Sequence, residues 1–468
     1  MSCLFPDRNR PHPAFLVLFA FALMLPLTGR PQSNPIGAEE FRQRRHAMLQ
    51  KIPDGVLLLH ARSLFSGDDE LYTHAFQQNP SFLYFTGLNS LLNAILALDG
   101  TTGESWLFVP TKLRGLAGGF EQALLKDGID SEETLLLDHV LAWDELRAFM
   151  EDRLADHPDL VAYTDDSHWS PSPESNPPGF LSMADPYVLW PQALHAAWPG
   201  LRIKSGKALI AVLRLVKSPA EIAAIRKVAR VSAEALRAGL RSLRAGKTQR
   251  QVEADIVSAC IEAGGEGPSF WPWVMSGPNA VLPKPLESFV DYQHLNRVMQ
   301  AGDLVRVDVG CDADFYKGDV GRTAPASGKF DADQKETWEL LVSAYQAAVA
   351  SMRPGLTHAQ IEETCRQTVA SRQKSLTTEL ARKVAEKILA GSDDVLWHLH
   401  GSGLEPGEGR PDTLHTGMVI EFEPMFSVEG QAFYLEDMIL ITETGHEILT
   451  SGLPYSADDL ERIIGQDE

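Results

Sequence analysis

Two stretches of the chain, Gly302-Asp-Leu-Val-Arg-Val-Asp308 and Gly417-Met-Val-Ile-Glu-Phe-Glu423, share one pattern. Each is a short apolar run, typical of a buried strand, that ends in a carboxylate. Each also follows a helix-start motif, and the two motifs repeat Arg, Gly, Thr, Gln and Glu in the same order. These motifs are Arg244-Ala-Gly-Lys-Thr-Gln-Arg-Gln-Val-Glu253 and Arg353-Pro-Gly-Leu-Thr-His-Ala-Gln-Ile-Glu362. We therefore predict a duplicated unit of helix and strand with pseudo-two-fold symmetry, whose equivalent carboxylates meet near the axis.

Strand-like segments carry acidic side chains at four places, although Asp and Glu are depleted in strands. These four residues are Asp308, Asp319, Glu423 and Glu436. A single acidic residue of this kind usually lies at an exposed edge, but four buried carboxylates would repel one another unless cations neutralised them. Two divalent cations would balance the four charges. His400, in Trp397-His-Leu-His-Gly-Ser-Gly403, is the candidate nitrogen ligand and indicates a transition metal such as Mn, Co or Zn.

At these residues the chain resembles the pita-bread metallopeptidases, the family of aminopeptidase P, prolidase and methionine aminopeptidase. The order Asp, Asp, His, Glu, Glu matches, as do Val-Asp-Val-Gly, Asp-x-x-Arg-Thr, His-x-x-Gly-Leu, Glu-Pro and Glu-Asp. Phe76–Gly87 resembles the N-terminal domain of the Xaa-Pro aminopeptidase branch, and Leu213–Ile222 resembles its domain junction. The resemblance implies an α/β N-terminal domain of the creatinase and aminopeptidase P type. It further implies an α+β pita-bread catalytic domain with pseudo-two-fold symmetry.

The resemblance also implies roles for the candidate site residues. Asp308 would hold one metal ion, His400 and Glu423 mainly the other, and Asp319 and Glu436 would bridge the two. We expect two divalent ions, with Mn first and Co or Zn as alternatives. Two close cations lower the pKa of a shared water, so a bridging hydroxide would attack the scissile peptide carbonyl. Glu423 would accept the proton of this nucleophile and pass it towards the leaving amine.

The chain departs from the family pattern at four positions near the expected site. Three family histidines and one arginine are replaced, and the residues now present are Lys284, Leu396, Gly407 and Tyr434. We predict that Lys284 is catalytic beside Glu423, because its ammonium group could donate to a developing oxyanion. Alternatively, His294 or His398 could supply the missing imidazole. These replacements put strict Xaa-Pro specificity in question.

The N-terminus has the pattern of a secretory signal peptide. Arg8 and Arg10 precede Ala14–Leu27, which is almost wholly apolar but shorter than a membrane span of roughly 20 residues. An uncleaved anchor and a mis-assigned start remain as alternatives. We therefore expect an exported protein, periplasmic or secreted, without stable membrane contact after processing. The predicted parts are residues 1–33 as signal peptide, 34–205 as the N-terminal α/β domain and 206–468 as the pita-bread metallopeptidase domain.

Local patterns predict the elements of both halves. A helix is expected over Leu136–Leu154 and a surface loop over Thr164–Gly179. The capping box Ser218-Pro-Ala-Glu221 predicts the start of a long helix, and two further boxes begin at Thr248 and Thr357. Short apolar runs predict buried strands at Gly55–His60, Ala94–Leu98 and Trp106–Pro110.

Composition excludes several classes of protein. The 468 residues are 44% hydrophobic and 22% charged, which is ordinary for a folded globular chain. A net charge of −21, from 42 Lys and Arg against 63 Asp and Glu, disfavours binding to nucleic acid. Four cysteines without a Cys-x-x-Cys pair indicate neither a disulfide scaffold nor a cysteine metal site.

We therefore predict a dinuclear-metal aminopeptidase of Xaa-Pro type that releases the N-terminal residue of peptides and forms a homodimer or homotetramer. The main alternative is a non-catalytic relative that binds peptide or a partner protein on the same fold. A metal-free amidinohydrolase like creatinase is a third hypothesis, but the intact set of ligand residues argues against it.

Overall fold

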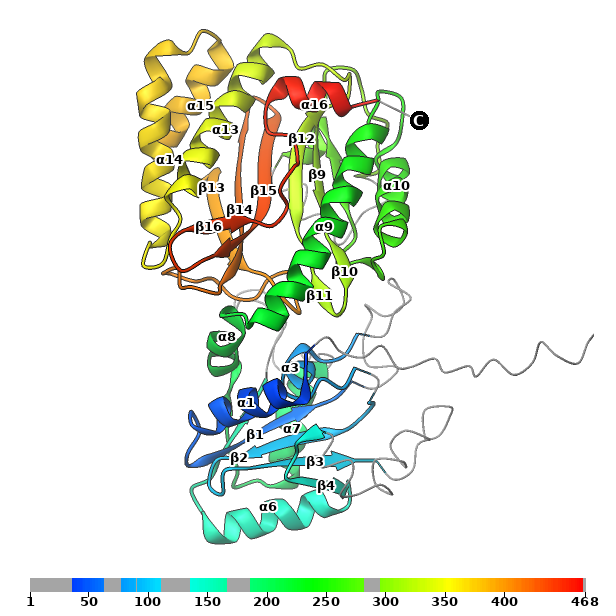
Figure 1. Ribbon diagram of the computed structural model, residues 1–468, viewed down its shortest axis with the longest axis vertical. Helices are drawn as coiled ribbons and strands as arrows, with labels where there is room; N and C mark the ends of the chain where they lie inside the picture. The colour runs from blue at the N-terminus through cyan, green and yellow to red at the C-terminus, as the bar shows by residue number, and fades with distance from the viewer. Residues whose placement is uncertain are drawn as a thin grey trace, which may run out of the picture. The chain divides into compact units, whose positions relative to one another are not determined.

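The structure is a computed structural model that describes residues 36–62, 77–89, 91–110, 135–165, 186–281 and 295–465. The chain from Pro35 onward forms one compact unit built around two large sheets (Figure 1). The predicted signal peptide, residues 1–33, lies outside the described residues. None of the helices in the described part of the chain combines the length and the hydrophobicity that crossing a bilayer requires.

The first sheet is mixed, with the strand order β4-β3-β2-β1-β5-β6. Its strands are β1 Gly55–His60, β2 Ile95–Asp99, β3 Glu104–Val109, β4 His139–Ala142, β5 Val161–Thr164 and β6 Arg202–Ser205. The helices of this region are α1 Ala38–Leu49, α3 Pro80–Thr86, α6 Glu145–Asp156 and α7 Pro186–Ala197. The three predicted apolar strands are confirmed, because β1, β2 and β3 occupy these runs and are buried along most of their length.

The predicted helix over Leu136–Leu154 is wrong at its start. The chain forms β4 over His139–Ala142 before α6 begins at Glu145. β4 pairs in parallel with β3, and Val140 is buried, so sheet pairing outweighs the local preference for a helix. The predicted loop begins where β5 ends at Thr164, and most of it lies outside the described residues.

The second sheet has seven antiparallel strands, with the order β13-β14-β15-β12-β9-β8 and with β16 paired to β15. Its strands are β8 Trp273–Ser276, β9 Leu304–Val309, β12 Val320–Pro325, β13 Val395–Gly401, β14 Val419–Val428, β15 Gln431–Ile441 and β16 His446–Ile448. A small three-stranded sheet adjoins it, formed by β7 Gly267–Pro268, β10 Cys311–Ala313 and β11 Tyr316–Lys317.

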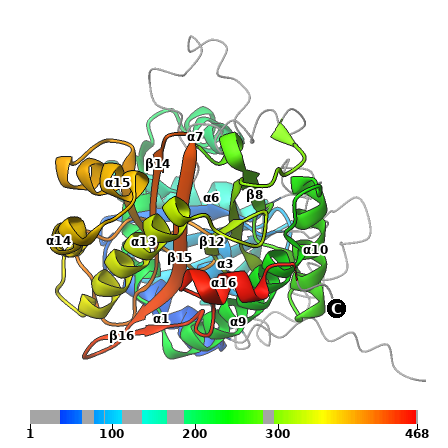
Figure 2. The ribbon, with the colours of Figure 1, turned by 90° about the horizontal axis from the view of Figure 1, so that it is seen from above.

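The predicted duplication is visible in how the helices are placed around the second sheet. Figures 1 and 2 show α9 and α10 beside the β9 half and α13, α14 and α15 beside the β13–β14 half. The helices are α8 Lys207–Leu215, α9 Pro219–Ser242, α10 Gln249–Glu262, α13 Ala332–Ser351, α14 His358–Arg372, α15 Glu379–Ala390 and α16 Ala457–Ile463, with short 3-10 helices η1 Gly277–Ala280 and η2 Gln373–Ser375. All three predicted capping boxes form, at Ser218, Thr248 and Thr357. Each half therefore runs from a capped helix to a strand that carries a carboxylate.

A disulfide joins Cys260, in α10, to Cys311, in β10. The number and spacing of the cysteines indicated no disulfide scaffold, and they did not predict this single bridge. The pair was not predictable, because 51 residues separate the two cysteines and only the contact between α10 and β10 brings them together. Cys365 is buried and free.

Candidate metal centre

The second sheet brings the five predicted metal ligands to one place. Four lie on strands and the fifth directly precedes one, the five strands are neighbours in the sheet, and all five residues are buried. They are Asp308 in β9, Asp319 just before β12, His400 in β13, Glu423 in β14 and Glu436 in β15. The sheet order, not the order along the chain, makes them neighbours.

Gly321 of β12 lies between two of these acidic residues and leaves room for the ring of Tyr434. It pairs with Asp308 on one side and with Glu436 on the other, so both acidic side chains flank the same position. A Cβ atom at Gly321 would lie 2.1 Å from the ring of Tyr434. A larger residue here would therefore push the Tyr434 ring out of the site.

The ligand atoms are close enough to share metal ions. His400 Nε2 lies 3.3 Å from Glu423 Oε1 and 3.9 Å from Glu436 Oε1. The ligand atoms of Asp319, His400 and Glu436 all lie within 4.8 Å of one another. The sequence prediction that these residues converge is thus matched by their positions.

Unsatisfied oxygens show that the site suits cations. Asp308 Oδ1, Asp319 Oδ1 and Glu436 Oε1 are buried, and each lacks a hydrogen-bond partner among the described residues. Carboxylates with one imidazole are the donors that Mn, Co and Zn accept. The residues present therefore fit a transition-metal site.

The electrostatics of the cluster lead to the same conclusion. Burial, followed by repulsion from neighbouring carboxylates, raises the pKa values of Asp319 and Glu436 well above their usual range. Burial also opposes ionisation of Glu423, but hydrogen bonds from His398 and His400 outweigh it and lower the pKa of Glu423 to about 2. Divalent cations would offset this repulsion and favour the ionised form of both carboxyl groups.

A buried ion pair fixes the strand that carries Glu436. Arg322 donates to both oxygens of Asp437, at 3.1 and 3.2 Å, and both residues are fully buried. The hydroxyl groups of Tyr345 and Tyr455 donate to the same carboxylate, each at 2.8 Å. The Asp-x-x-Arg-Thr and Glu-Asp motifs therefore each supply one candidate ligand and one member of this pair.

Arg306 of β9 also lies at the site, and the sequence analysis did not predict it. Arg306 of β9 lies over the ring of Tyr434 at 3.8 Å, and its Nη2 donates to Asp308 Oδ2 at 2.8 Å. The same Nη2 is 4.0 Å from Glu423 Oε2, and the Tyr434 hydroxyl donates to Glu436. Arg306 and Tyr434 together contact three of the five candidate ligands. A charged residue within the buried run of β9, two positions before Asp308, was the available signal.

Replacing Arg306 with leucine is expected to weaken metal binding by about 10- to 100-fold, because Asp308 would lose the donor that orients it. Arg306→Lys should keep part of the affinity, since an ammonium group retains the charge but not the planar stack on Tyr434. Competition between the protein and a chelating dye for Co²⁺ would measure this. Arg226→Leu, which removes an exposed pair with Glu447, is the matched control. Equal affinities of Arg306→Leu and the control would contradict this role.

The other predicted positions have different outcomes. Lys284 and His294 lie outside the described residues, so the catalytic role predicted for Lys284 remains a prediction. Leu396 lies in β13 and is 39% exposed, and Gly407 lies in the loop that follows this strand. His398 of β13 was only an alternative in the sequence analysis, yet its Nδ1 contacts Glu423 Oε1.

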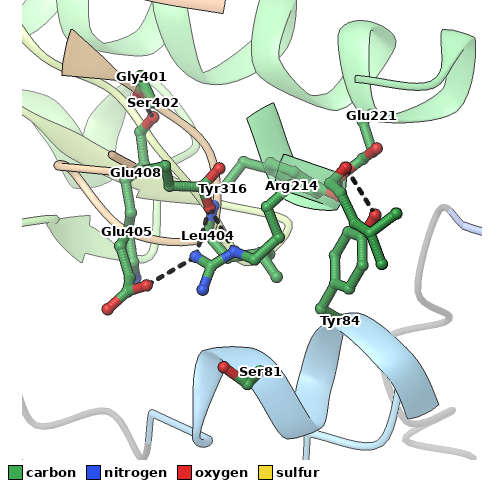
Figure 3. Close-up of polar contacts among 12 residues, drawn as sticks. Ser81, Tyr84, Arg214, Glu221, Tyr316, Gly401, Ser402, Leu404, Glu405 and Glu408 are labelled. Carbon is green, nitrogen blue, oxygen red and sulfur yellow. Dashed lines mark hydrogen bonds and ion pairs between the residues drawn. The ribbon is translucent and has the colours of Figure 1, made fainter. Parts of the chain in front are cut away.

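The loop after His400 is held by a buried ion network that the sequence analysis missed. Glu408 accepts from Arg214 Nε at 3.2 Å, from Lys217 Nζ at 2.6 Å and from the Leu404 backbone amide at 2.6 Å. Glu405 makes a second pair with Arg214 at 2.7 Å (Figure 3). Lys217 belongs to the junction motif that resembles the Xaa-Pro branch, so this motif anchors the loop that follows the candidate ligand His400.

Comparison with known proteins agrees with this architecture. The model of metallopeptidase family M24 matches residues 223–443, and that of the aminopeptidase P N-terminal domain matches residues 41–160. The Xaa-Pro aminopeptidase of Escherichia coli is 27% identical over 92% of this chain and 98% of its own length. Proline aminopeptidase P II from Yersinia pestis superposes with a TM-score of 0.68 at 26% identity, covering 92% of this chain and all of the other.

A solved structure of Zn-substituted E. coli aminopeptidase P in complex with product is also similar, with a TM-score of 0.68 at 25% identity. It covers 92% of this chain and 100% of that one. The matched range of the M24 model, residues 223–443, includes the strands at which the five candidate ligands lie. The chain belongs to the pita-bread metallopeptidases of family M24, in the branch of aminopeptidase P and prolidase, and is a metallo-aminopeptidase.

Proposed function

We propose that this metallo-aminopeptidase binds two divalent metal ions and hydrolyses the N-terminal bond of peptides with proline in the second position. The ligands would be Asp308, Asp319, His400, Glu423 and Glu436. The observation that carries the proposal is the convergence of these five buried side chains, with three carboxylate oxygens left without hydrogen bonds among the described residues. The similarity to Xaa-Pro aminopeptidase over 92% of the chain supports the substrate class.

The metal ions and the residues around them would have different roles in the reaction. When bound, the metal ions would supply Lewis-acid activation of water and of the scissile carbonyl. Glu423 would accept the proton of the attacking water and deliver it to the leaving amine. His400 holds Glu423 from one side, at 3.3 Å, and the Arg306 guanidinium lies 4.0 Å from its other oxygen. These contacts place the Glu423 carboxylate before substrate arrives.

The identity of the metal is part of the proposal. We propose that Mn binds at the metal position whose ligands are all carboxylates, because carboxylate oxygens suit this ion. Zn or Co would be accepted where His400 contributes. The Zn-substituted relative supports the capacity of this fold to hold Zn.

A hydrolysis panel tests the function. Metal-free protein is supplied with Mn, Co or Zn and assayed on matched Xaa-Pro and non-Pro dipeptides and tripeptides. The proposal expects release of the N-terminal residue that requires metal and is faster with proline after the scissile bond. Metal-dependent cleavage without preference for proline would retain the aminopeptidase and reject the Xaa-Pro class. Peptide binding without turnover under any metal would favour the non-catalytic alternative.

The predicted role of Lys284 can be tested in the same assay. Lys284→Ala should lower kcat by about 10²–10³-fold if its ammonium group stabilises the oxyanion. Lys284→His should restore part of the rate. If Lys284→Ala matches the wild type, the residue has no catalytic role.

We also propose that the protein is exported and loses about its first 33 residues. The Cys260–Cys311 disulfide supports this, because disulfides persist in oxidising compartments. The intact mass of the native protein should place its start near residue 34. Thiol labelling of the denatured protein should modify only Cys365 before reduction, and Cys260 and Cys311 as well after it. A native chain that begins at Met1, with all cysteines reactive, would contradict export.

Light scattering would test the proposed homodimer or homotetramer.

A further inference from the structure

We infer that His398 is a second imidazole ligand at the metal position held by His400 and Glu423. The inference rests on the proposed dinuclear site and deepens it, because it makes the two metal positions chemically different. The resemblance to the family predicts only one histidine ligand, so His398 is an addition.

The strand geometry places His398 in the cluster. Side chains of a strand alternate between its faces, so residues 398 and 400 of β13 point to the same side. His398 is paired directly across the sheet with Glu423, and His400 with Glu421. The two imidazole rings are 5.2 Å apart between their centroids. The contact of His398 with Glu423 therefore follows from the register of β13 on β14.

The donor atoms are suitably placed for one ion. The ligand atoms of His398, His400 and Glu423 all lie within 4.8 Å of one another. His398 turns Nδ1 towards Glu423 Oε1, and His400 turns Nε2 towards the same oxygen. The two ring nitrogens thus converge on one carboxylate oxygen of Glu423, and all three atoms are potential ligands of one ion.

The surroundings of His398 do not suggest a structural role. Its Nε2 atom is buried and has no hydrogen-bond partner among the described residues. A histidine kept for structure normally has both ring nitrogens satisfied. The remaining alternative is that His398 only orients Glu423, by donating a hydrogen bond from Nδ1.

The consequence is a difference in metal preference. The other position would be held by Asp308 and by the two expected bridging residues, Asp319 and Glu436, which all offer oxygen only. Imidazole suits Zn and Co, whereas carboxylate suits Mn. The metal-binding position at His398 and His400 should therefore select Zn or Co, and the metal-binding position formed by carboxylates should accept Mn.

Cobalt binding separates a ligand from an orienting residue. Full-length metal-free wild type, His398→Gln and His398→Ala are titrated with Co²⁺, with stoichiometry and the visible absorption spectrum as readouts. Glutamine can still donate a hydrogen bond to Glu423 but does not replace an imidazole ligand. His415→Gln is the matched control, because His415 is exposed in the segment before β14 and its backbone amide, not its side chain, donates to Met418 Sδ.

A ligand role predicts that His398→Gln binds its second Co²⁺ at least about tenfold more weakly and with an altered spectrum. His398→Ala should regain the wild-type spectrum when imidazole is added, because the His398 side chain is 28% exposed and the vacated space can be reached. Wild-type affinity and spectrum in His398→Gln would overturn the inference while leaving the proposed function intact. A wild type that binds no Co²⁺ would overturn both.

Competition between metals tests the predicted selectivity. Metal-free wild type is dialysed against equal concentrations of Mn²⁺ and Zn²⁺ and analysed for bound metal. We expect the same ratio of bound Zn to bound Mn in the wild type and His415→Gln, and a lower ratio in His398→Gln. The same ratio of the two metals in wild type and His398→Gln would contradict the difference between the positions.

Discussion

Replacing Glu423 with glutamine is expected to lower kcat on an Xaa-Pro peptide by about 10²–10⁴-fold, the usual contribution of a positioned proton acceptor. Glutamine keeps the size of the side chain but cannot accept a proton. Burial opposes ionisation of Glu423, but hydrogen bonds from His398 and His400 outweigh it and lower its pKa, so the wild-type side chain is a carboxylate that can receive a proton, which glutamine is not. Steady-state kinetics with saturating metal would measure the loss.

The Glu423 experiment needs two controls, because this residue is also a candidate metal ligand. Metal content should be measured on the same samples, so that lost activity is compared at equal occupancy. Glu443→Gln, in the exposed connection between β15 and β16, should retain wild-type kcat. If Glu423→Gln turns over at the wild-type rate, the proposed chemistry is wrong.

Glu408→Gln is expected to destabilise the protein by about 3–5 kcal/mol, the usual cost of breaking a buried ion pair. Glutamine would leave the buried cations Arg214 and Lys217 without their main counter-charge. Glu405→Gln is the matched control, since Glu405 binds the same arginine but its side chain is 25% exposed. It should cost less than about 1 kcal/mol. Urea unfolding with equal m-values would give both differences.

The contribution of Glu408 to the free energy of unfolding should depend on pH. Burial would raise the pKa of Glu408, but Arg214 and Lys217 lower it to about 2, from an ordinary 4.5. A carboxyl group whose pKa is lowered in the folded state stabilises the fold above its unfolded pKa. This stabilisation disappears as pH falls from about 4.5 to about 2, so the gap between wild type and Glu408→Gln should narrow over this range. If the difference in free energy of unfolding between wild type and Glu408→Gln stays constant over this range, the charge of Glu408 does not cause it.

The sequence by itself determined the features that are local or repeated. Ser218, Thr248 and Thr357 cap their helices as predicted, because a capping box depends on residues three positions apart. The two apolar runs that end in Asp308 and Glu423 became strands of one sheet. Their carboxylates could be proposed as metal ligands, because buried acidic residues need a compensating charge whatever the details of the fold.

Only the tertiary structure decided which distant residues join these carboxylates. Arg306 lies over Tyr434 because β9, β12 and β15 are neighbours in the sheet, and His398 meets Glu423 because of the register between β13 and β14. The segment His139–Ala142 became a strand through pairing with β3, against its helical pattern. Sheet order and register are set by packing across the whole chain, and a shift of one residue would turn every side chain to the opposite face. Local sequence patterns contain the strands and the ligands, whereas their pairing arises only when the sheet has formed.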